Sequence, residues 1–172
     1  QIGVSASLVD DYLTIDGKPF TGTAKLEAKR TYGAELSPEL RDPRLSQTVF
    51  MPGQQIQSDG TVYTWPPLDA TNYHQNTTGY SILKYEEFNT SNTAAYTTAN
   101  RSQAPAIQVR YADILLNYAE ALAELDGAGN ASEIKKALQP LRDRVNMPGV
   151  DFDREYNTDA DYPFHNLDKY IQ

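Results

Sequence analysis

The stretch RYADILLNYAEALAEL, residues 110–125, decides the fold class, because it predicts a strong helix with apolar groups on two faces. Large apolar side chains recur at spacings of three and four residues, as in one helical stripe. They are Tyr111, Ile114, Leu115, Tyr118, Leu122 and Leu125. The small residues Ala112, Ala119 and Ala123 form a second face that another backbone can approach closely. A surface helix needs only one apolar stripe, so this pattern predicts neighbours on two sides.

A second helix is predicted after a short connector. The first helix should run from about Val109 to Leu125 and end at Asp126-Gly127, with the glycine as a left-handed cap. Ser132 is the expected N-cap of the second helix. Its apolar positions repeat at spacings of four, three and four, at Ile134, Leu138, Leu141 and Val145.

Two helices joined in this way form an antiparallel hairpin, with the second helix on the alanine face of the first. Pro140 lies inside the second helix, where it removes a backbone hydrogen bond, so we expect a bend there. The hairpin alone cannot cover the Tyr/Leu face of the first helix. Helical-repeat proteins cover such a face by stacking further hairpins, and because this chain contains one hairpin and no internal repeat, we expect hairpins outside it to be the natural neighbours of that face.

Composition excludes several classes of function. The chain has 172 residues, enough for one domain, and its formal net charge of −8 argues against a nucleic-acid partner. No apolar run approaches the ~20 residues of a membrane-spanning helix. Cysteine is absent, which excludes disulfides and thiol chemistry. The two histidines, His74 and His165, lie far apart in the sequence, and no metal or other cofactor is predicted.

The part before the hairpin is predicted to be rich in loops. A short helix is expected from Val4 to about Tyr12, then a turn at Asp16-Gly17, and the best strand candidate is LSQTVF, residues 45–50. Residues 51–109 hold only six of the 38 charged residues but seven of the 18 aromatic ones. Disordered linkers usually lose aromatic residues and keep charge, so we expect long, ordered loops, which are more often functional than connective.

Several segments together resemble the SusD/RagB family of Bacteroidetes surface lipoproteins. Besides the helix at 110–125, they are SLVDDYLTIDGKPF (7–20), RDPRL (41–45), GYSILKYEEF (79–88) and ALQPLRDRVNMPG (137–149). Each is short, but they occur in the family's order and span nearly the whole chain. The resemblance implies a mainly α fold of tetratricopeptide-type hairpins, with long ordered loops and a few short strands.

The resemblance also implies a function without catalysis. Family members capture oligosaccharides or polysaccharides at the cell surface and deliver them to a SusC-like TonB-dependent outer-membrane transporter. This chain then resembles a middle-to-late fragment of a surface-exposed outer-membrane lipoprotein, with its lipid anchor outside the chain. Other family members take peptide cargo. The alternatives are therefore a peptide binder of the same family, or a helical module that only contacts another protein.

Sugar binding needs flat rings for the apolar face of a pyranose and polar groups for its hydroxyls. The segment VYTWPPLDATNYHQN, residues 62–76, offers both. The candidate carbohydrate-binding residues are Tyr63, Trp65, Asp69, Asn72 and Tyr73. Two roles stay open for the single tryptophan, either an exposed sugar platform or a buried anchor for the loop.

Other patterns favour structural roles. Arg41, Asp42 and Arg44 are expected to tie a turn together, and Tyr80 to pack inside the fold. Glu86-Glu87 cannot flank one glycosidic bond as adjacent residues of a strand, so hydrolysis is not predicted. DFDREYNTDAD (151–161) lacks the glycine and glutamate of a calcium-binding EF-hand loop, so we expect a solvated acidic loop. The chain is thus predicted to be one SusD-like unit, with a loop-rich part (1–108), a helical hairpin (109–147), and an acidic loop leading to a further helix (148–172).

Overall fold

The computed structural model describes residues 3–31, 33–55, 60, 62–64, 78–84 and 107–155. The helices in these ranges are α1 (Ala6–Asp11), α2 (Gly22–Arg30), the 3-10 turn η1 (Ala34–Leu36), α3 (Pro43–Ser46), α5 (Tyr111–Asp126), α6 (Ala131–Asp143) and α7 (Phe152–Glu155). Within the same ranges, β pairing is limited to isolated bridges such as Val49 with Ile82. The predicted mainly α fold class is confirmed. No helix in the described ranges is long and apolar enough to cross a membrane.

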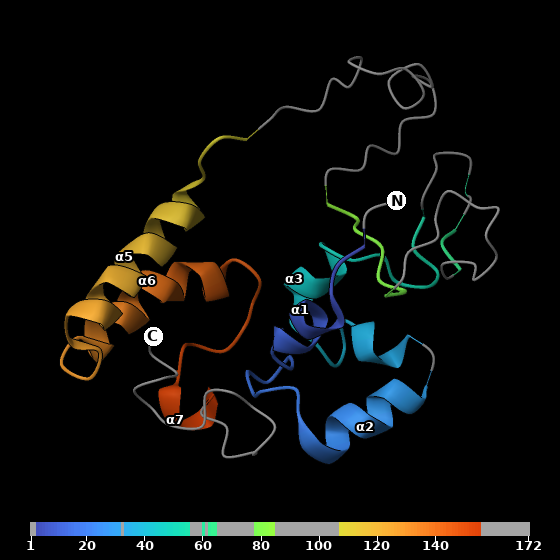
Figure 1. Ribbon diagram of the computed structural model, residues 1–172, viewed down its shortest axis with the longest axis horizontal. Helices are drawn as coiled ribbons and strands as arrows, with labels where there is room; N and C mark the ends of the chain where they lie inside the picture. Colours follow the sequence, from blue (N-terminus) through green and yellow to red (C-terminus); the bar gives the residue numbers. More distant parts are fainter. Residues whose placement is uncertain are drawn as a thin grey trace.

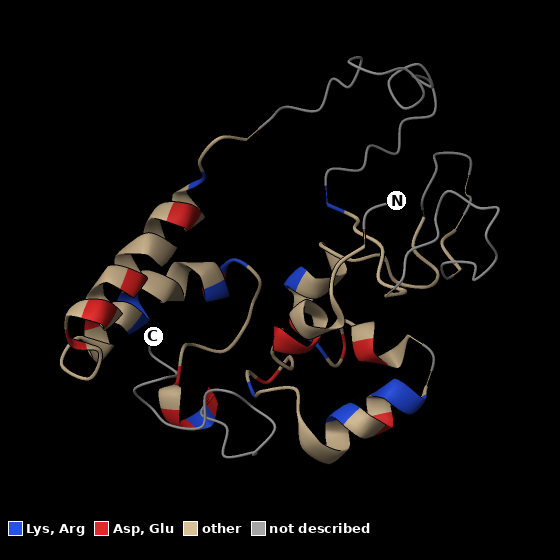
Figure 2. Ribbon diagram, in the orientation of Figure 1, with Lys and Arg blue, Asp and Glu red and all other residues tan. Residues whose placement is uncertain are grey.

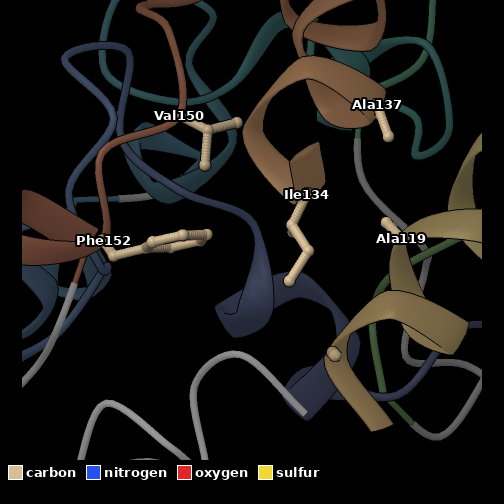
Figure 3. Close-up of a cluster of buried hydrophobic side chains, with 6 residues drawn as sticks. Ala119, Ile134, Ala137, Val150 and Phe152 are labelled. Atoms are coloured by element: carbon tan, nitrogen blue, oxygen red, sulfur yellow. The ribbon is translucent and has the colours of Figure 1, made fainter. Parts of the chain in front are cut away.

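The predicted hairpin is formed by α5 and α6, which lie side by side (Figure 1). The alanine face of α5 meets α6, as predicted, because Ala119 and Ala123 are buried in one cluster with Ile134 and Ala137. Figure 3 shows Ala119 near Ile134 and Ala137, with Val150 and Phe152 on the other side of Ile134. Small side chains on both helices allow this close approach. Val150 from the connection after α6 and Phe152, the first residue of α7, complete the cluster.

The ends of the two helices differ from the prediction. Gly127 has right-handed α dihedral angles, φ −55° and ψ −50°, so it is not a left-handed cap. Asn130, not Ser132, is the N-cap of α6. Its side-chain amide nitrogen donates to the carbonyl of Leu122, 3.0 Å away. The left-handed residue follows α6 instead, at Asn146 with φ 55°. Asparagine tolerates this conformation better than most residues. The residues around Asn146 give no sequence signal that separates it from other polar residues, so its left-handed conformation was not predicted.

The Tyr/Leu face of α5 remains largely exposed. Tyr111 is 72% exposed, Ile114 54%, Tyr118 51% and Leu125 80%. Leu122 is the member of the stripe that packs partly against the hairpin cluster. The hairpin therefore buries the alanine face of α5 and leaves its Tyr/Leu face exposed. The sequence predicts this outcome for a hairpin without a further neighbour.

A second cluster lies among α1, η1 and α3. Its buried members are Val9, Leu36, Leu45, Val49 and Tyr80. Tyr80 is 8% exposed, which confirms the expected structural role. The short helix predicted near the start is α1, with Ser5 as its N-cap, and the Asp16-Gly17 turn forms with φ 79° at Gly17. This cluster is separate from that of the hairpin, so the described part of the chain has two small cores.

The predicted strand at residues 45–50 is wrong. Leu45 and Ser46 belong to α3, and residues 47–48 form a turn. The helix begins there because the Asp42 carboxylate accepts from the Arg44 amide at 2.9 Å and Pro43 occupies the first turn. Aspartate as N-cap followed by proline is a helix-start signal, and it outweighs the β propensity of the residues that follow.

Candidate binding site

Tyr63 is the one predicted sugar-binding residue within the described ranges, and its ring is buried. It is 5% exposed and stacks on Phe50, with ring centroids 5.0 Å apart and 22° between planes. Its hydroxyl lies 3.1 Å from the Ser81 hydroxyl. Its backbone amide donates to the Gln54 carbonyl at 2.7 Å. These contacts fix the beginning of the segment 62–76 to the chain before it and to residue 81.

The other predicted contacts, Trp65, Asp69, Asn72 and Tyr73, lie outside the described residues. So do Glu86 and Glu87. Of the predicted set, the structure therefore describes Tyr63 alone, and it places this side chain in the interior of the described part of the chain.

The Arg-Asp-Pro-Arg turn is a structural junction, as expected. Arg41 is fully buried and its guanidinium donates to four backbone carbonyls: Glu35 and Tyr12, each at 2.8 Å, Leu13 at 3.4 Å, and Val9. It also lies over the Phe20 ring, 3.6 Å from the centroid. Three of these carbonyls follow or end α1, where helical acceptors have no intrahelical donor and a cation is favoured. Burial lowers the pKa of Arg41 to about 10, which still leaves it charged at neutral pH.

Asp42 is also buried, and it pairs with Arg44 through both carboxylate oxygens. Burial alone would raise the pKa of Asp42. The hydrogen bonds from the Arg44 side chain and amide outweigh this effect, so the pKa is lowered from its ordinary value. The carboxylate thus stays ionised while it caps α3.

The segment after α6 is not a solvated acidic loop over residues 151–155. Asp151 caps α7, and Glu155 is 1% exposed. The Glu155 carboxylate accepts from Arg142 of α6 at 2.7 Å and from Arg154 at 3.2 Å. Arg154 Nε in turn donates to the Gly17 carbonyl at 3.4 Å. Residues 151–155, which are acidic in sequence, therefore take part in a buried ion-pair network that connects α6, α7 and the turn at Asp16-Gly17.

Within the described ranges, two hollows lie between the hairpin and the first part of the chain. The larger, about 380 Å³, is lined by Leu8, Asp11, Tyr12, Leu13, Asp42, Arg44, Arg142 and Glu155. Its buried charges are paired with each other, Arg44 with Asp42 and Arg142 with Glu155. These pairs stabilise the packing around the hollow, and Asp11 leaves its lining with one more acidic residue than basic residues. Among the residues that the structure describes, no group of three or more His, Asp or Glu side chains could hold a metal ion.

The second hollow, about 280 Å³, has a different composition. It is lined by Tyr12, Arg44, Gln47, Thr48, Lys84, Arg110, Ala112, Leu116, Leu141 and Arg144. Among the residues that the structure describes, the lining contains four Lys and Arg residues and no Asp or Glu residue. Basic residues colour the beginning of α5, the end of α6 and part of α3 blue in Figure 2. These four residues come from separate segments of the chain, so no linear motif identified them.

Comparison with known proteins gives a match along the full chain. The model of the SusD family, designated SusD_RagB, matches residues 1–172. The searches of curated proteins and of solved structures returned no significant match.

Proposed function

The chain belongs to the SusD family, and from this premise we propose that it captures oligosaccharides at the cell surface for delivery to a SusC-like TonB-dependent transporter. SusD family proteins are non-catalytic surface lipoproteins of the outer membrane that in general bind glycans and pair with SusC transporters. The match along all 172 residues is the observation that carries the proposal. The chain acts in this scheme as one SusD-like unit, with the loop-rich part and the hairpin performing different tasks.

The proposed glycan contacts are in the segment 62–76. Trp65 and Tyr73 supply rings that can stack on a pyranose, and Asp69 and Asn72 supply acceptors and donors for hydroxyls. The buried ring of Tyr63 supports an anchoring role, because it is fixed between Phe50 and Ser81. An anchored base lowers the entropy lost when a loop orders around its ligand.

Calorimetry with a panel of soluble neutral and acidic oligosaccharides tests this function, using the chain and its Trp65→Ala variant. Tyr118→Ala is the matched control, since it removes an exposed ring from α5, which is not part of the proposed segment. We expect at least one glycan to bind, with affinity reduced about tenfold or more by Trp65→Ala, because stacking on one ring contributes roughly 1–3 kcal/mol by analogy with base stacking. Tyr118→Ala should bind as the unmodified chain does. If Trp65→Ala leaves glycan binding unchanged, the binding site lies elsewhere than at Trp65. The absence of binding to every glycan would refute the function.

A second candidate function is favoured by the exposed face of α5. Four large apolar side chains, Tyr111, Ile114, Tyr118 and Leu125, are each more than half exposed along one helix. Contiguous apolar surface of this kind marks contacts with other proteins. In this alternative the hairpin is a protein-interaction module, or the cargo is a peptide. A Tyr118→Asp variant should lose binding to a purified SusC-like transporter in a co-elution assay if this face is the contact. Unchanged co-elution would exclude it.

A further inference from the structure

The second hollow carries unbalanced positive charge. Arg44 is neutralised in part by Asp42, and the Arg110 guanidinium lies 3.8 Å from an Asp113 oxygen, a long and exposed ion pair. Arg144 is exposed at the end of α6 and forms no ion pair with any acidic residue that the structure describes. Lys84 is the fourth cation among the residues that line the hollow. The lining therefore has an excess of positive charge in a chain whose net charge is −8.

The rest of the lining suits a sugar ring, which has polar hydroxyls and one apolar face. Leu116 of α5 and Leu141 of α6 supply apolar surface, and Gln47 and Thr48 supply hydrogen-bonding groups. The Tyr12 hydroxyl donates to the Thr48 hydroxyl at 3.2 Å, which orients both groups at the edge of the hollow. A volume of about 280 Å³ lies just below the range of sites that hold drug-sized ligands, so it suits one sugar unit rather than a whole oligosaccharide.

We propose that this hollow, between α3, the beginning of α5 and the end of α6, binds the anionic group of an acidic oligosaccharide, a uronate carboxylate or a sulfate ester. The inference deepens the proposed function, on which it rests, by naming the class of glycan. Guanidinium groups pair with both anions through parallel N–H donors. No side chain in the described ranges forms an ion pair with Arg144. An anionic glycan is repelled by the acidic chain as a whole, so a local cluster of cations determines where it binds. Neutral glycans gain nothing from these charges.

Calorimetry at low ionic strength tests the inference with three probes. An oligogalacturonide carries carboxylates, its methyl-esterified form has the same backbone without charge, and a sulfated galactan oligosaccharide carries the other anion. The variant is Arg144→Gln, which changes an exposed side chain and leaves both cores intact. Arg30→Gln on α2 is the matched control, because it removes the same charge from an exposed side chain far from the hollow. Arg144→Lys keeps the charge and loses the planar guanidinium.

We expect an acidic probe to bind more tightly than the esterified one, and to bind more weakly as salt rises. Arg144→Gln should weaken it about tenfold or more, as for loss of one charge-assisted hydrogen bond. Arg144→Lys should recover part of the loss, and Arg30→Gln should bind as the unmodified chain does. Equal weakening by both Gln variants would show a general charge effect and overturn the site.

Other outcomes separate this inference from the function on which it rests. Neutral glycans that bind while both acidic probes do not would overturn the inference and leave the proposed function intact. Acidic probes that bind equally to the unmodified chain and to Arg144→Gln would also overturn it. Inorganic sulfate is titrated as a control: binding of sulfate without binding of either acidic oligosaccharide would mark an adventitious ion only and overturn the inference. The absence of any glycan binding would refute both.

Discussion

The buried guanidinium of Arg41 gives the strongest prediction about stability. Arg41→Met keeps much of the side chain's volume but removes four hydrogen bonds to carbonyls at the end of α1 and in η1, of which the Leu13 carbonyl keeps another donor, the Asp42 amide. Hydrogen bonds from a charged donor contribute about 1.5–3 kcal/mol each, a gross total of roughly 6–12 kcal/mol. Removing the guanidinium also removes the desolvation cost of a buried charge, which offsets several kcal/mol of this loss. We therefore expect a net loss of about 3–5 kcal/mol, a large part of the ~5–15 kcal/mol that stabilises a typical domain.

Urea unfolding followed by circular dichroism at 222 nm measures this loss. With a slope of about 2 kcal/mol per molar urea, the midpoint should fall by roughly 1.5–2.5 M. Arg30→Met is the control, because Arg30 is exposed and its ion pair with Glu27 contributes little. Arg41→Lys should lie between the two, since an ammonium has three donors without the planar geometry. A free energy of unfolding for Arg41→Met within about 1 kcal/mol of the unmodified chain would refute the assignment of Arg41 as the organising group.

Three further predictions concern pH, helix packing and the buried glutamate. Because the pKa of Asp42 is lowered in the folded state, its contribution to stability is complete above about pH 4 and is lost as pH falls further. Urea midpoints from pH 7 to pH 2 should thus fall less for Asp42→Asn than for the unmodified chain, and identical slopes would contradict this. Ala119→Leu should cost about 1–3 kcal/mol by overpacking the hairpin, whereas Ala121→Leu, at an exposed position of α5, should be nearly neutral in the same assay. Glu155→Gln should lower the free energy of unfolding by about 2–4 kcal/mol, because it leaves two arginines beside a neutral amide, and a loss under 0.5 kcal/mol would exclude this role.

Hairpin and helix content could be predicted because their signals are local. The spacing of apolar residues placed α5 within two residues at its beginning and one at its end, and the alanine face correctly identified the contact with α6. Cap residues were less predictable. Gly127 does end α5, but with right-handed dihedral angles, and Asn130 rather than Ser132 is the N-cap of α6. The backbone of the connector selects among several suitable side chains, and the left-handed residue, Asn146, lies after α6 instead.

Buried charge and pairing between distant segments could not be predicted. The burial of Arg41 depends on carbonyls about 30 residues away, which carry no sequence signal because every residue has one. Glu155 looked like part of a solvated run, and its burial depends on Arg142 of α6. The basic hollow likewise draws on Arg44, Lys84, Arg110 and Arg144. Such sites form only when the fold brings separate segments together.

The two cores have a consequence for the order of folding. The contacts of α5 with α6 are local in sequence, so the hairpin closes only a short loop and can form early. The first part of the chain needs partners far along the sequence: the Thr78 hydroxyl donates to the Val4 carbonyl 74 residues away, and Arg154 contacts Gly17 across 137 residues. We therefore expect a transition state in which the hairpin is formed and the junction at Arg41 is not. Substitutions in the hairpin would then slow folding, and those at the junction would mainly accelerate unfolding.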